Sequence, residues 1–212
     1  MIFFKGENMT AGYGGADIIK NCNIQVEAGE IVVVIGPNGA GKSTAMKAML
    51  GMLKLKNGSV KFNNDEITNM LPQDRVNLGI AFVPQTRNVF TGMTVEENLE
   101  MGAFLRTDDI QNTINQVYDL FPVLGKKRNQ NVGELSGGQR QQVAFGRALM
   151  TKPTILMLDE PTAGVSPIVM DDLFTRIIEV GKTGVGILMV EQNAKHALGI
   201  ANRGYVMVNG EN

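Results

Sequence analysis

Residues 36–44 read GPNGAGKST, a glycine-rich run that matches the pattern G-x-x-x-x-G-K-[S/T]. The run follows the apolar stretch 31–35 (IVVVI) and precedes a segment with helical periodicity. Gly39 and Gly41 let the backbone curl around phosphate oxygens, because no Cβ stands in the way. The amides of residues 39–44 then point inward at a helix N-terminus, where the helix dipole favours anions. The stretch therefore predicts a phosphate-binding loop.

The side chains of this loop indicate the ligand. Lys42 is expected to neutralise the β- and γ-phosphates of a nucleotide such as ATP, and Ser43 to offer its hydroxyl to Mg²⁺. A glycine-rich turn without function is the alternative, and the strand before the loop and the helix after it argue against that reading. The predicted nucleotide contacts in the loop are Gly36, Pro37, Asn38, Gly39, Ala40, Gly41, Lys42, Ser43 and Thr44.

Two acidic residues end another apolar stretch, ILMLDEP at residues 155–161. Buried carboxylates are costly unless cations or hydrogen bonds compensate them. A Mg²⁺ ion near Ser43 would supply that charge to Asp159, directly or through a water molecule. Glu160 is then placed to polarise an attacking water as a general base. A solvated pair of acids at a strand end is the alternative interpretation.

A second anion-binding helix start is predicted at LSGGQ, residues 135–139. Ser136 is expected to be the N-cap, and Gly137 and Gly138 leave the first amides unobstructed. A generic cap would explain the Ser-Gly pair but not the whole pentapeptide, which Gln139 completes.

Apolar runs and helical patterns alternate along the chain. Strands are predicted at 31–35, 80–83, 155–158, 185–190 and 205–208, and helices at 42–53, 94–105, 108–121, 138–150, 167–180 and 193–201. The near-continuous apolarity of the strands is typical of a sheet covered on both faces. The pattern therefore predicts an α/β fold with a mostly parallel sheet.

Two regions depart from this alternation. Residues 1–30 alternate like antiparallel strands, and residues 87–150 form an almost wholly helical block with a capping box at Thr94 and Glu97. We expect one domain over residues 1–212. Its nucleotide-binding core would comprise 1–86 and 151–212, and the block 87–150 would be an inserted helical subdomain that carries LSGGQ.

Composition excludes several classes of protein. The 212 residues carry a net charge of −1, so nothing indicates nucleic acid as a partner. Cys22 is the single cysteine, which excludes an intramolecular disulfide and favours a small packing residue. The first ten residues do not resemble a signal peptide, and no apolar run approaches the ~18 residues of a spanning helix. If the protein meets a membrane, we expect it to do so through a partner.

These motifs, in this order, resemble the ATPase subunits of ABC transporters over essentially the whole chain. The resemblance implies a P-loop NTPase of the ABC ATPase type, with an antiparallel N-terminal β part and an inserted helical subdomain. In this family the pentapeptide of one subunit closes over ATP held by another. It therefore implies that two subunits enclose two ATP molecules, with Ser136, Gly137, Gly138 and Gln139 reaching the nucleotide in trans.

The family pattern assigns three further residues. Tyr13 lies where the family stacks an aromatic ring on adenine, although a core aromatic at a strand end is the alternative. Gln85, in FVPQ, matches the glutamine that touches Mg²⁺ and senses the transport partner, with a simple polar loop residue as the alternative. Gln192 occupies the position at which the family usually has its switch histidine. Its amide can donate to the γ-phosphate but cannot titrate near neutral pH.

Two other positions bear on the same loops. Ser166 replaces the aspartate that usually precedes the proline of the interface loop PTAGVSP, so the signal across the dimer is expected to differ. His196, the one histidine, lies four residues after Gln192 and is interpreted as a helix-surface residue. Three apolar residues of a loop-like stretch, Val89, Phe90 and Met93, could line the groove that receives a membrane subunit or simply pack the helical block.

The stretches VFTGMTVEENLEMGAFLR, PTAGVSP and VEQNAKHAL are most similar to the second ATPase subunit of branched-chain amino acid importers and to relatives that import urea or amides. The resemblance implies transmembrane permease subunits, a second ATPase and, indirectly, a periplasmic solute-binding protein. It places the chain peripherally at the cytoplasmic face of the membrane. Lipopolysaccharide export, import of another amino acid and a nucleotide-gated scaffold that does not hydrolyse ATP remain alternatives.

Overall fold

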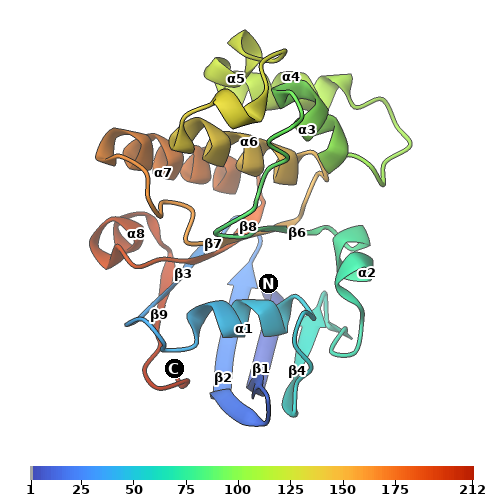
Figure 1. The fold of residues 1–212 in the computed structure, drawn as a ribbon. Coiled ribbons are helices and arrows are strands. Elements are labelled where there is room, and N and C mark those ends of the chain that lie inside the picture. Colours follow the sequence, from blue (N-terminus) through green and yellow to red (C-terminus); the bar gives the residue numbers. More distant parts are fainter. Residues whose placement is uncertain (1) are drawn as a thin grey trace.

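The strands of the chain form two sheets (Figure 1). The computed structural model describes residues 2–212, except for the side chain of Ile2. The antiparallel sheet has the order β2-β1-β4-β5 and contains β1 (Ile2–Tyr13), β2 (Ala16–Glu27), β4 (Asn57–Phe62) and β5 (Asp65–Glu66). The parallel sheet has the order β6-β7-β8-β3-β9 and contains β6 (Ile80–Val83), β7 (Ile155–Asp159), β8 (Gly186–Val190), β3 (Ile31–Ile35) and β9 (Arg203–Val206). The predicted α/β fold with an antiparallel N-terminal part is confirmed.

Both faces of the parallel sheet are covered. Helix α1 (Lys42–Met49) packs against strands of both sheets, whereas α6 (Gly137–Leu149) and α7 (Pro167–Lys182) cover the opposite face of the parallel sheet (Figure 1). In β3, Val32 and Val34 belong to the core on the α1 side, and Ile31 and Val33 belong to the core beneath α6 and α7. Successive side chains thus point into different cores, which explains why the strand has no polar position.

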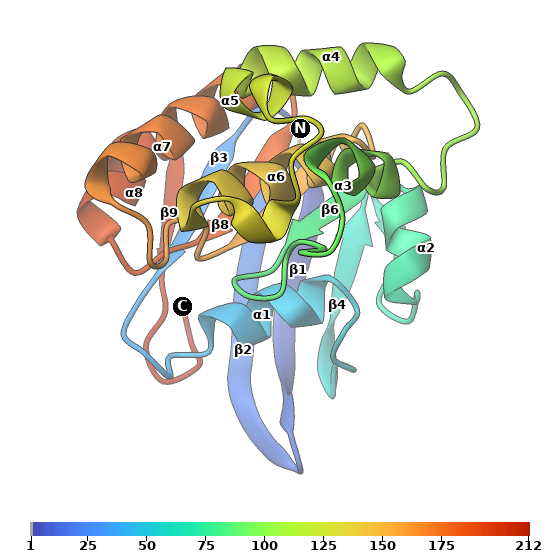
Figure 2. The ribbon, with the colours of Figure 1, turned by 45° about the horizontal axis from the view of Figure 1, so that its top comes forward.

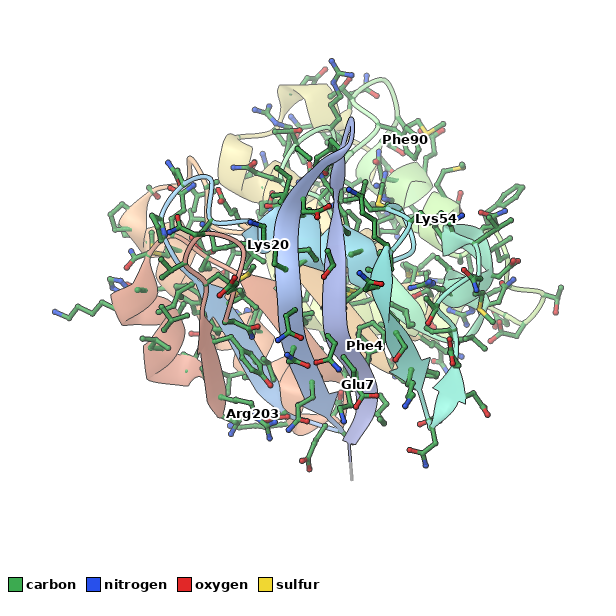
Figure 3. All side chains as sticks on the ribbon, turned by 90° about the horizontal axis from the view of Figure 1, so that it is seen from below. Phe4, Glu7, Lys20, Lys54, Phe90 and Arg203 are labelled. Atoms are coloured by element: carbon green, nitrogen blue, oxygen red, sulfur yellow. The ribbon has the colours of Figure 1, made fainter. Side chains whose placement is uncertain are left out.

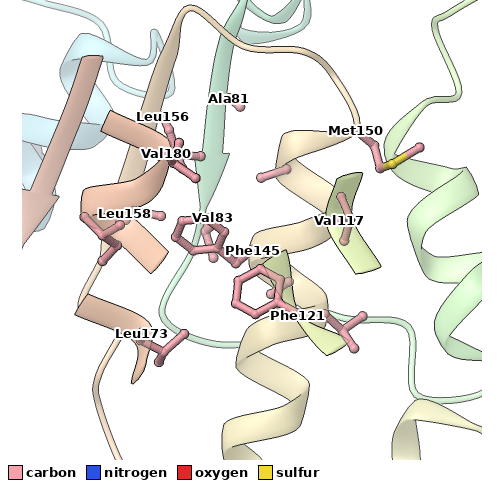
Figure 4. Packing of buried hydrophobic residues seen from close by; sticks show 14 of the residues in the cluster. Ala81, Val83, Val117, Phe121, Phe145, Met150, Leu156, Leu158, Leu173 and Val180 are labelled. Carbon is pink, nitrogen blue, oxygen red and sulfur yellow. The ribbon is translucent and has the colours of Figure 1, made fainter. Parts of the chain in front are cut away.

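The helical block occupies the side of the molecule away from the antiparallel sheet (Figure 2). It contains α3 (Val95–Gly102), α4 (Gln111–Leu120), α5 (Pro122–Lys126), the 3₁₀ turn Val132–Glu134 and α6. Phe121 and Phe145 meet edge to face at the centre of its core, with ring centroids 5.6 Å apart (Figure 4). The same core continues to Leu156 and Leu158 of β7, so the block is packed onto the sheet that carries the acidic pair.

The outer face of the antiparallel sheet is polar (Figure 3). Glu7 on β1 lies between Lys5 and Lys61 of the same face, and these ammonium groups lower the pKa of its carboxyl to about 2. The inner face carries Phe4, Met9 and Ile24, among others, against α1. The antiparallel sheet therefore packs against the core with one face and meets solvent with the other.

Several element ends differ from the expectations. Helix α1 stops at Met49 rather than at residue 53, because Gly51 (φ +78°) donates to Ala48 O and Met52 to Lys47 O in a Schellman motif. Strand β9 begins at Arg203 rather than at Tyr205. The polar helix α2 (Pro72–Asn77) and the short α5 were not predicted, and α8 (Ala194–Ile200) lies inside its predicted range. No helix within residues 2–212 is long and apolar enough to span a membrane.

Candidate functional site

The glycine-rich loop runs from the end of β3 to the first turn of α1. Gly36, Gly39 and Gly41 all have positive φ, between +81° and +152°. A Cβ at Gly36 would stand 2.3 Å from Met207 O, and one at Gly41 would stand 2.9 Å from Ile19 Cγ2. At Gly39 no atom lies within 4 Å of that position, so this residue faces open space. The loop is thus pressed against the fold on one side and open to a ligand on the other.

The open side of the loop faces a cavity of about 280 Å³. Its lining consists of Ile18, Asn38, Gly39, Ala40, Gly41, Lys42, Ser43, Thr44 and Glu160. The Lys42 side chain is buried, and its Nζ donates to Gly36 O (2.8 Å) and Pro37 O (3.1 Å). The predicted phosphate loop and Glu160, the predicted base, therefore line the same cavity.

Ser43 and Asp159 are in direct contact. The Ser43 hydroxyl donates to Asp159 Oδ1 at 2.8 Å, which links the first turn of α1 to the end of β7. Burial raises the pKa of Asp159, and the hydrogen bond from Ser43 opposes that shift. A hydroxyl and a carboxylate held this close are hard oxygen donors of the kind that Mg²⁺ prefers beside phosphate oxygens. The two residues fit the predicted metal site.

Three predicted residues from three separate segments meet at one carboxylate oxygen. Glu160 Oε2 accepts a hydrogen bond from Gln85 Nε2 (2.6 Å) and another from Gln192 Nε2 (2.7 Å). The Glu160 backbone is left-handed (φ +49°), and its amide donates to Val190 O at 2.9 Å. The sequence predicted each residue as part of the site, but not that both amides would converge on Glu160.

A buried carboxylate beside this group was not predicted as functional. Glu191 is 2% exposed, and its Oε1 accepts from the amide and the hydroxyl of Thr162. Its Oε2 accepts from the Gln192 amide at 3.1 Å. The available signal was an acid at the end of a wholly apolar strand, which is the signal that singled out Asp159.

The pentapeptide begins α6 as expected. Ser136 Oγ accepts from the Gln139 amide (3.3 Å), and Gln139 Oε1 accepts from the Ser136 amide (3.2 Å), so the two residues form a capping box. A Cβ at Gly138 would stand 2.6 Å from Val169 Cγ1 of α7, which explains the glycine as a packing residue, whereas Gly137 is open. None of these four residues lines the phosphate-loop cavity. Their predicted contact with a nucleotide stays a prediction.

Tyr13 lies apart from the loop cavity. It is 49% exposed at the end of β1, next to the turn that leads into β2, and it is absent from the cavity lining. Ile18 on β2 lines the cavity instead. The core alternative for Tyr13 does not hold at this exposure, and its contact with adenine stays a prediction.

A separate groove of about 190 Å³ lies beside Gln85. It is lined by Val76, Ala81, Phe82, Val83, Pro84, Asn88, Gly102, Ala144, Arg147, Ala148 and Thr151. The residues Val89, Phe90 and Met93 are not part of this lining. Val89 packs on the core of the helical block, and Phe90 lies under the Arg147 guanidinium at 4.8 Å. Phe90 thus touches the rim of the groove through Arg147.

The two remaining residues lie on the surface. Ser166 is exposed at the N-cap position of α7, and its side chain makes no capping hydrogen bond. His196 is exposed on α8, stacks on Phe174 with centroids 6.4 Å apart, and has its Nδ1 3.0 Å from Asn193 Oδ1. The structure confirms the interpretation of His196 as a helix-surface residue.

Comparisons with known proteins agree on one family. Residues 19–163 match the model described as ABC transporter. The chain is 40% identical to BraG of Pseudomonas aeruginosa, a high-affinity branched-chain amino acid transport ATP-binding protein, over 96% of this chain and 88% of that protein. It is also 40% identical to LivF of Archaeoglobus fulgidus, a probable branched-chain amino acid transport ATP-binding protein, over 95% and 86%.

More distant relatives share the fold. The lipopolysaccharide export system ATP-binding protein LptB of Escherichia coli is 30% identical over 99% of this chain and 88% of that protein. A crystal structure of the ADP conformation of an ATP-binding cassette from an ABC transporter superposes with a TM-score of 0.89 at 32% identity, covering 100% of this chain and 89% of that chain.

Proposed function

The chain belongs to the ABC transporter family of nucleotide-binding ATPases, and on that premise we propose that it energises import of branched-chain amino acids. The observation that carries the catalytic part is the meeting of Gln85 and Gln192 at Glu160, beside the Ser43–Asp159 contact. The names of the two relatives at 40% identity support the choice of solute.

The phosphate loop holds the nucleotide in this proposal. The Ala40 amide donates to Pro37 O at 3.2 Å. The other amides of residues 39–44 would bind phosphate oxygens at the start of α1, and Lys42 would neutralise the β- and γ-phosphates. Ser43 and Asp159 would hold Mg²⁺, with the side-chain oxygen of Gln85 as a further ligand, and the ion would neutralise charge on the phosphates. Tyr13 stacks on adenine from the end of β1, which its exposure permits.

Hydrolysis depends on Glu160. Its carboxylate accepts a proton from the attacking water, while the amides of Gln85 and Gln192 keep that carboxylate oriented toward the loop cavity. Gln192 also donates to the γ-phosphate, and an amide can do so without a change of charge. The segments that carry the three residues end or follow β6, β7 and β8, which are neighbours in the sheet.

The site is completed by a second subunit. The first turn of α6 lies across the parallel sheet from α1, so Ser136, Gly137, Gly138 and Gln139 do not line this chain's own loop cavity (Figure 1). We propose that they reach the nucleotide of a partner ATPase and that two chains enclose two ATP molecules. In this arrangement residues 87–150 act as a helical subdomain inserted into a core formed by 1–86 and 151–212.

The membrane partners dock at the groove beside Gln85. Its walls come from α2, β6, α3 and α6, so an occupant would touch both the core and the helical block. We propose transmembrane permease subunits as occupants, which places the chain peripherally at the cytoplasmic face of the membrane. A periplasmic solute-binding protein then acts on this chain only through those subunits.

The solute is tested on the assembly. The chain is co-purified with its membrane subunits, reconstituted with the solute-binding protein, and assayed for phosphate release. Leucine, isoleucine or valine should stimulate ATP hydrolysis, whereas urea and polar amino acids should not. Stimulation by urea or an amide alone would contradict the proposed solute and leave the ATPase intact.

Lipopolysaccharide export is the second candidate, because LptB of Escherichia coli is 30% identical over nearly the whole chain. The identity of the co-purified membrane subunits separates the two functions. Permeases that bind amino acids support the first, and subunits that extract lipopolysaccharide support the second.

A further inference from the structure

Glu191 is among the least exposed charged side chains described in the chain. It is 2% exposed, and no ion pair to it is found among residues 2–212. Such a charge is costly unless hydrogen bonds compensate it. Oε1 accepts from the Thr162 amide at 3.1 Å and from the Thr162 hydroxyl at 2.8 Å, and Oε2 accepts from the Gln192 amide at 3.1 Å. Both oxygens are therefore engaged by the two loops that follow β7 and β8.

Every backbone partner of this carboxylate is a donor. The amides of Thr162 and Gln192 can only donate. An ionised carboxylate accepts on both oxygens, whereas a glutamine amide accepts on one side and donates on the other. A glutamine at this position would place its NH₂ group against a backbone N–H in either orientation. The site thus requires an acceptor on both sides.

The bonds of Glu191 close a ring that contains the proposed base. Thr162 follows Glu160 by two residues, and the Glu160 amide donates to Val190 O. Glu191 ties Thr162 to the backbone of Gln192, and the side chain of Gln192 returns to Glu160 Oε2 at 2.7 Å. Glu191 thus links the loop that carries Gln192 to the loop that carries Glu160, and it is not itself among the residues that line the loop cavity.

We propose that Glu191 is a positioning residue for hydrolysis, which holds Gln192 against Glu160 by joining the Gln192 backbone to Thr162. The proposal rests on the proposed function, since it acts on the same base. It predicts that loss of one acceptor oxygen lowers turnover through Gln192 and leaves nucleotide binding in place.

The first variant is Glu191→Gln, in the full chain alone and in the co-purified assembly. It should lower kcat by about tenfold or more with KM for ATP within about twofold of wild type. The matched control is Glu30→Gln. Glu30 also accepts a backbone amide (Glu27 N, 2.8 Å) but lies before the amino end of β3, away from the site. This control should keep the wild-type kcat. A wild-type kcat for Glu191→Gln would overturn the proposal.

Epistasis with Gln192 separates positioning from general stability. If Glu191 acts through Gln192, then adding Glu191→Gln to Gln192→Ala should lower kcat by less than about twofold. Effects that multiply would overturn the proposal, because a purely structural role would persist without the Gln192 side chain. Should Glu191→Gln not fold, Thr162→Val removes the hydroxyl bond alone and should show a lower kcat with the same epistasis. An unchanged kcat in that variant would also overturn it.

The failure of the underlying function gives a different result. A wild-type chain that binds ATP but releases no phosphate, alone or in the assembly, contradicts the proposed function itself. A wild-type chain that hydrolyses ATP while Glu191→Gln matches it, or multiplies with Gln192→Ala, contradicts the role of Glu191 alone.

Discussion

At the scale of single residues, the site combines a strained backbone with a crowded carboxylate. Glu160 has φ +49°, a conformation that costs a non-glycine residue on the order of 1 kcal/mol. The hydrogen bond from its amide to Val190 O and the two amide donors at Oε2 hold it there. The strain therefore falls on the residue that we propose as the base, which is where such strain is typically found.

Gln192 and His196 give the sharpest contrast between neighbouring polar residues. Gln192→Ala removes a donor to Glu160 and should lower kcat by about tenfold. His196→Ala removes only a surface ring stacked on Phe174 and should leave kcat within about twofold of wild type. Both are measured as phosphate release at saturating Mg-ATP. The opposite pair of outcomes would move the switch role to His196.

Arg75 lies outside the site, and its loss should lower stability markedly. It is fully buried and donates to four carbonyl oxygens, those of Met49, Ile67, Thr68 and Met70. Arg75→Met removes the donor to each of these carbonyls, although Ile67 O keeps the hydrogen bond from the Met70 amide. The variant should lower the free energy of unfolding by about 2–4 kcal/mol. Urea denaturation measures the loss. Arg128→Met, at an exposed position, is the control and should change stability little.

Residue types and motif spacing predicted most of the site but not its internal bonds. Lys42, Ser43, Asp159 and Glu160 were found because phosphate chemistry demands those groups at those spacings. Glu191 was missed, because a strand-end acid in the sequence does not reveal which donors face it. The convergence of two amides on Glu160 depends on β6 and β8 both lying next to β7, which is a tertiary fact.

At the scale of elements, hydrophobic patterns predicted strands better than helix ends. Strands β3, β7 and β8 are apolar along nearly their whole length, so their positions follow from composition, whereas the half-exposed edge strand β9 was predicted two residues late. Helix α1 ended early because a Schellman motif at Gly51 closes it, although the apolar pattern continues to Leu53. The polar helix α2 was missed, because six residues offer too little periodicity.

The capping box of α3 provides a test at this scale. Thr94 Oγ1 accepts from the Glu97 amide, and Glu97 Oε2 accepts from the Thr94 amide. Thr94→Ala should lower the free energy of unfolding by about 1 kcal/mol. Thr175→Ala, at an exposed position within α7, should change it by less than about 0.5 kcal/mol. Equal losses in the two variants would show that the capping box adds no stability beyond that of an exposed threonine.

At the scale of the whole molecule, a buried thiol in the core between the two sheets should lower the free energy of unfolding at alkaline pH. Cys22 on β2 is fully buried, and burial raises the pKa of its thiol to about 12. The folded state thus keeps a proton that the unfolded chain loses near pH 9, so stability falls as pH rises between these values.

The expected slope from Cys22 is at most about 1.4 kcal/mol per pH unit. Urea unfolding at pH 8 and pH 10 measures it as the difference between wild type and Cys22→Ala, which cancels the other titrating groups. As pH rises, wild type should lose stability relative to Cys22→Ala. A pH-independent difference would mean that the thiol titrates normally in the folded state.

The layered architecture as a whole followed from the sequence, whereas the relation between its two nucleotide-binding segments did not. The phosphate loop and the pentapeptide lie on opposite faces of the parallel sheet, so one chain does not bring them together. That separation supports our proposal of a site shared between two subunits.

Glu160, we propose, activates water for ATP hydrolysis in a site built by the phosphate loop and the ends of β7 and β8. Phosphate release by Glu160→Gln, measured beside wild type at saturating Mg-ATP together with ATP affinity, tests it most directly. ATP binding should be unchanged in this variant, and its kcat should be lower by about 100-fold or more. Wild-type turnover in Glu160→Gln would contradict it.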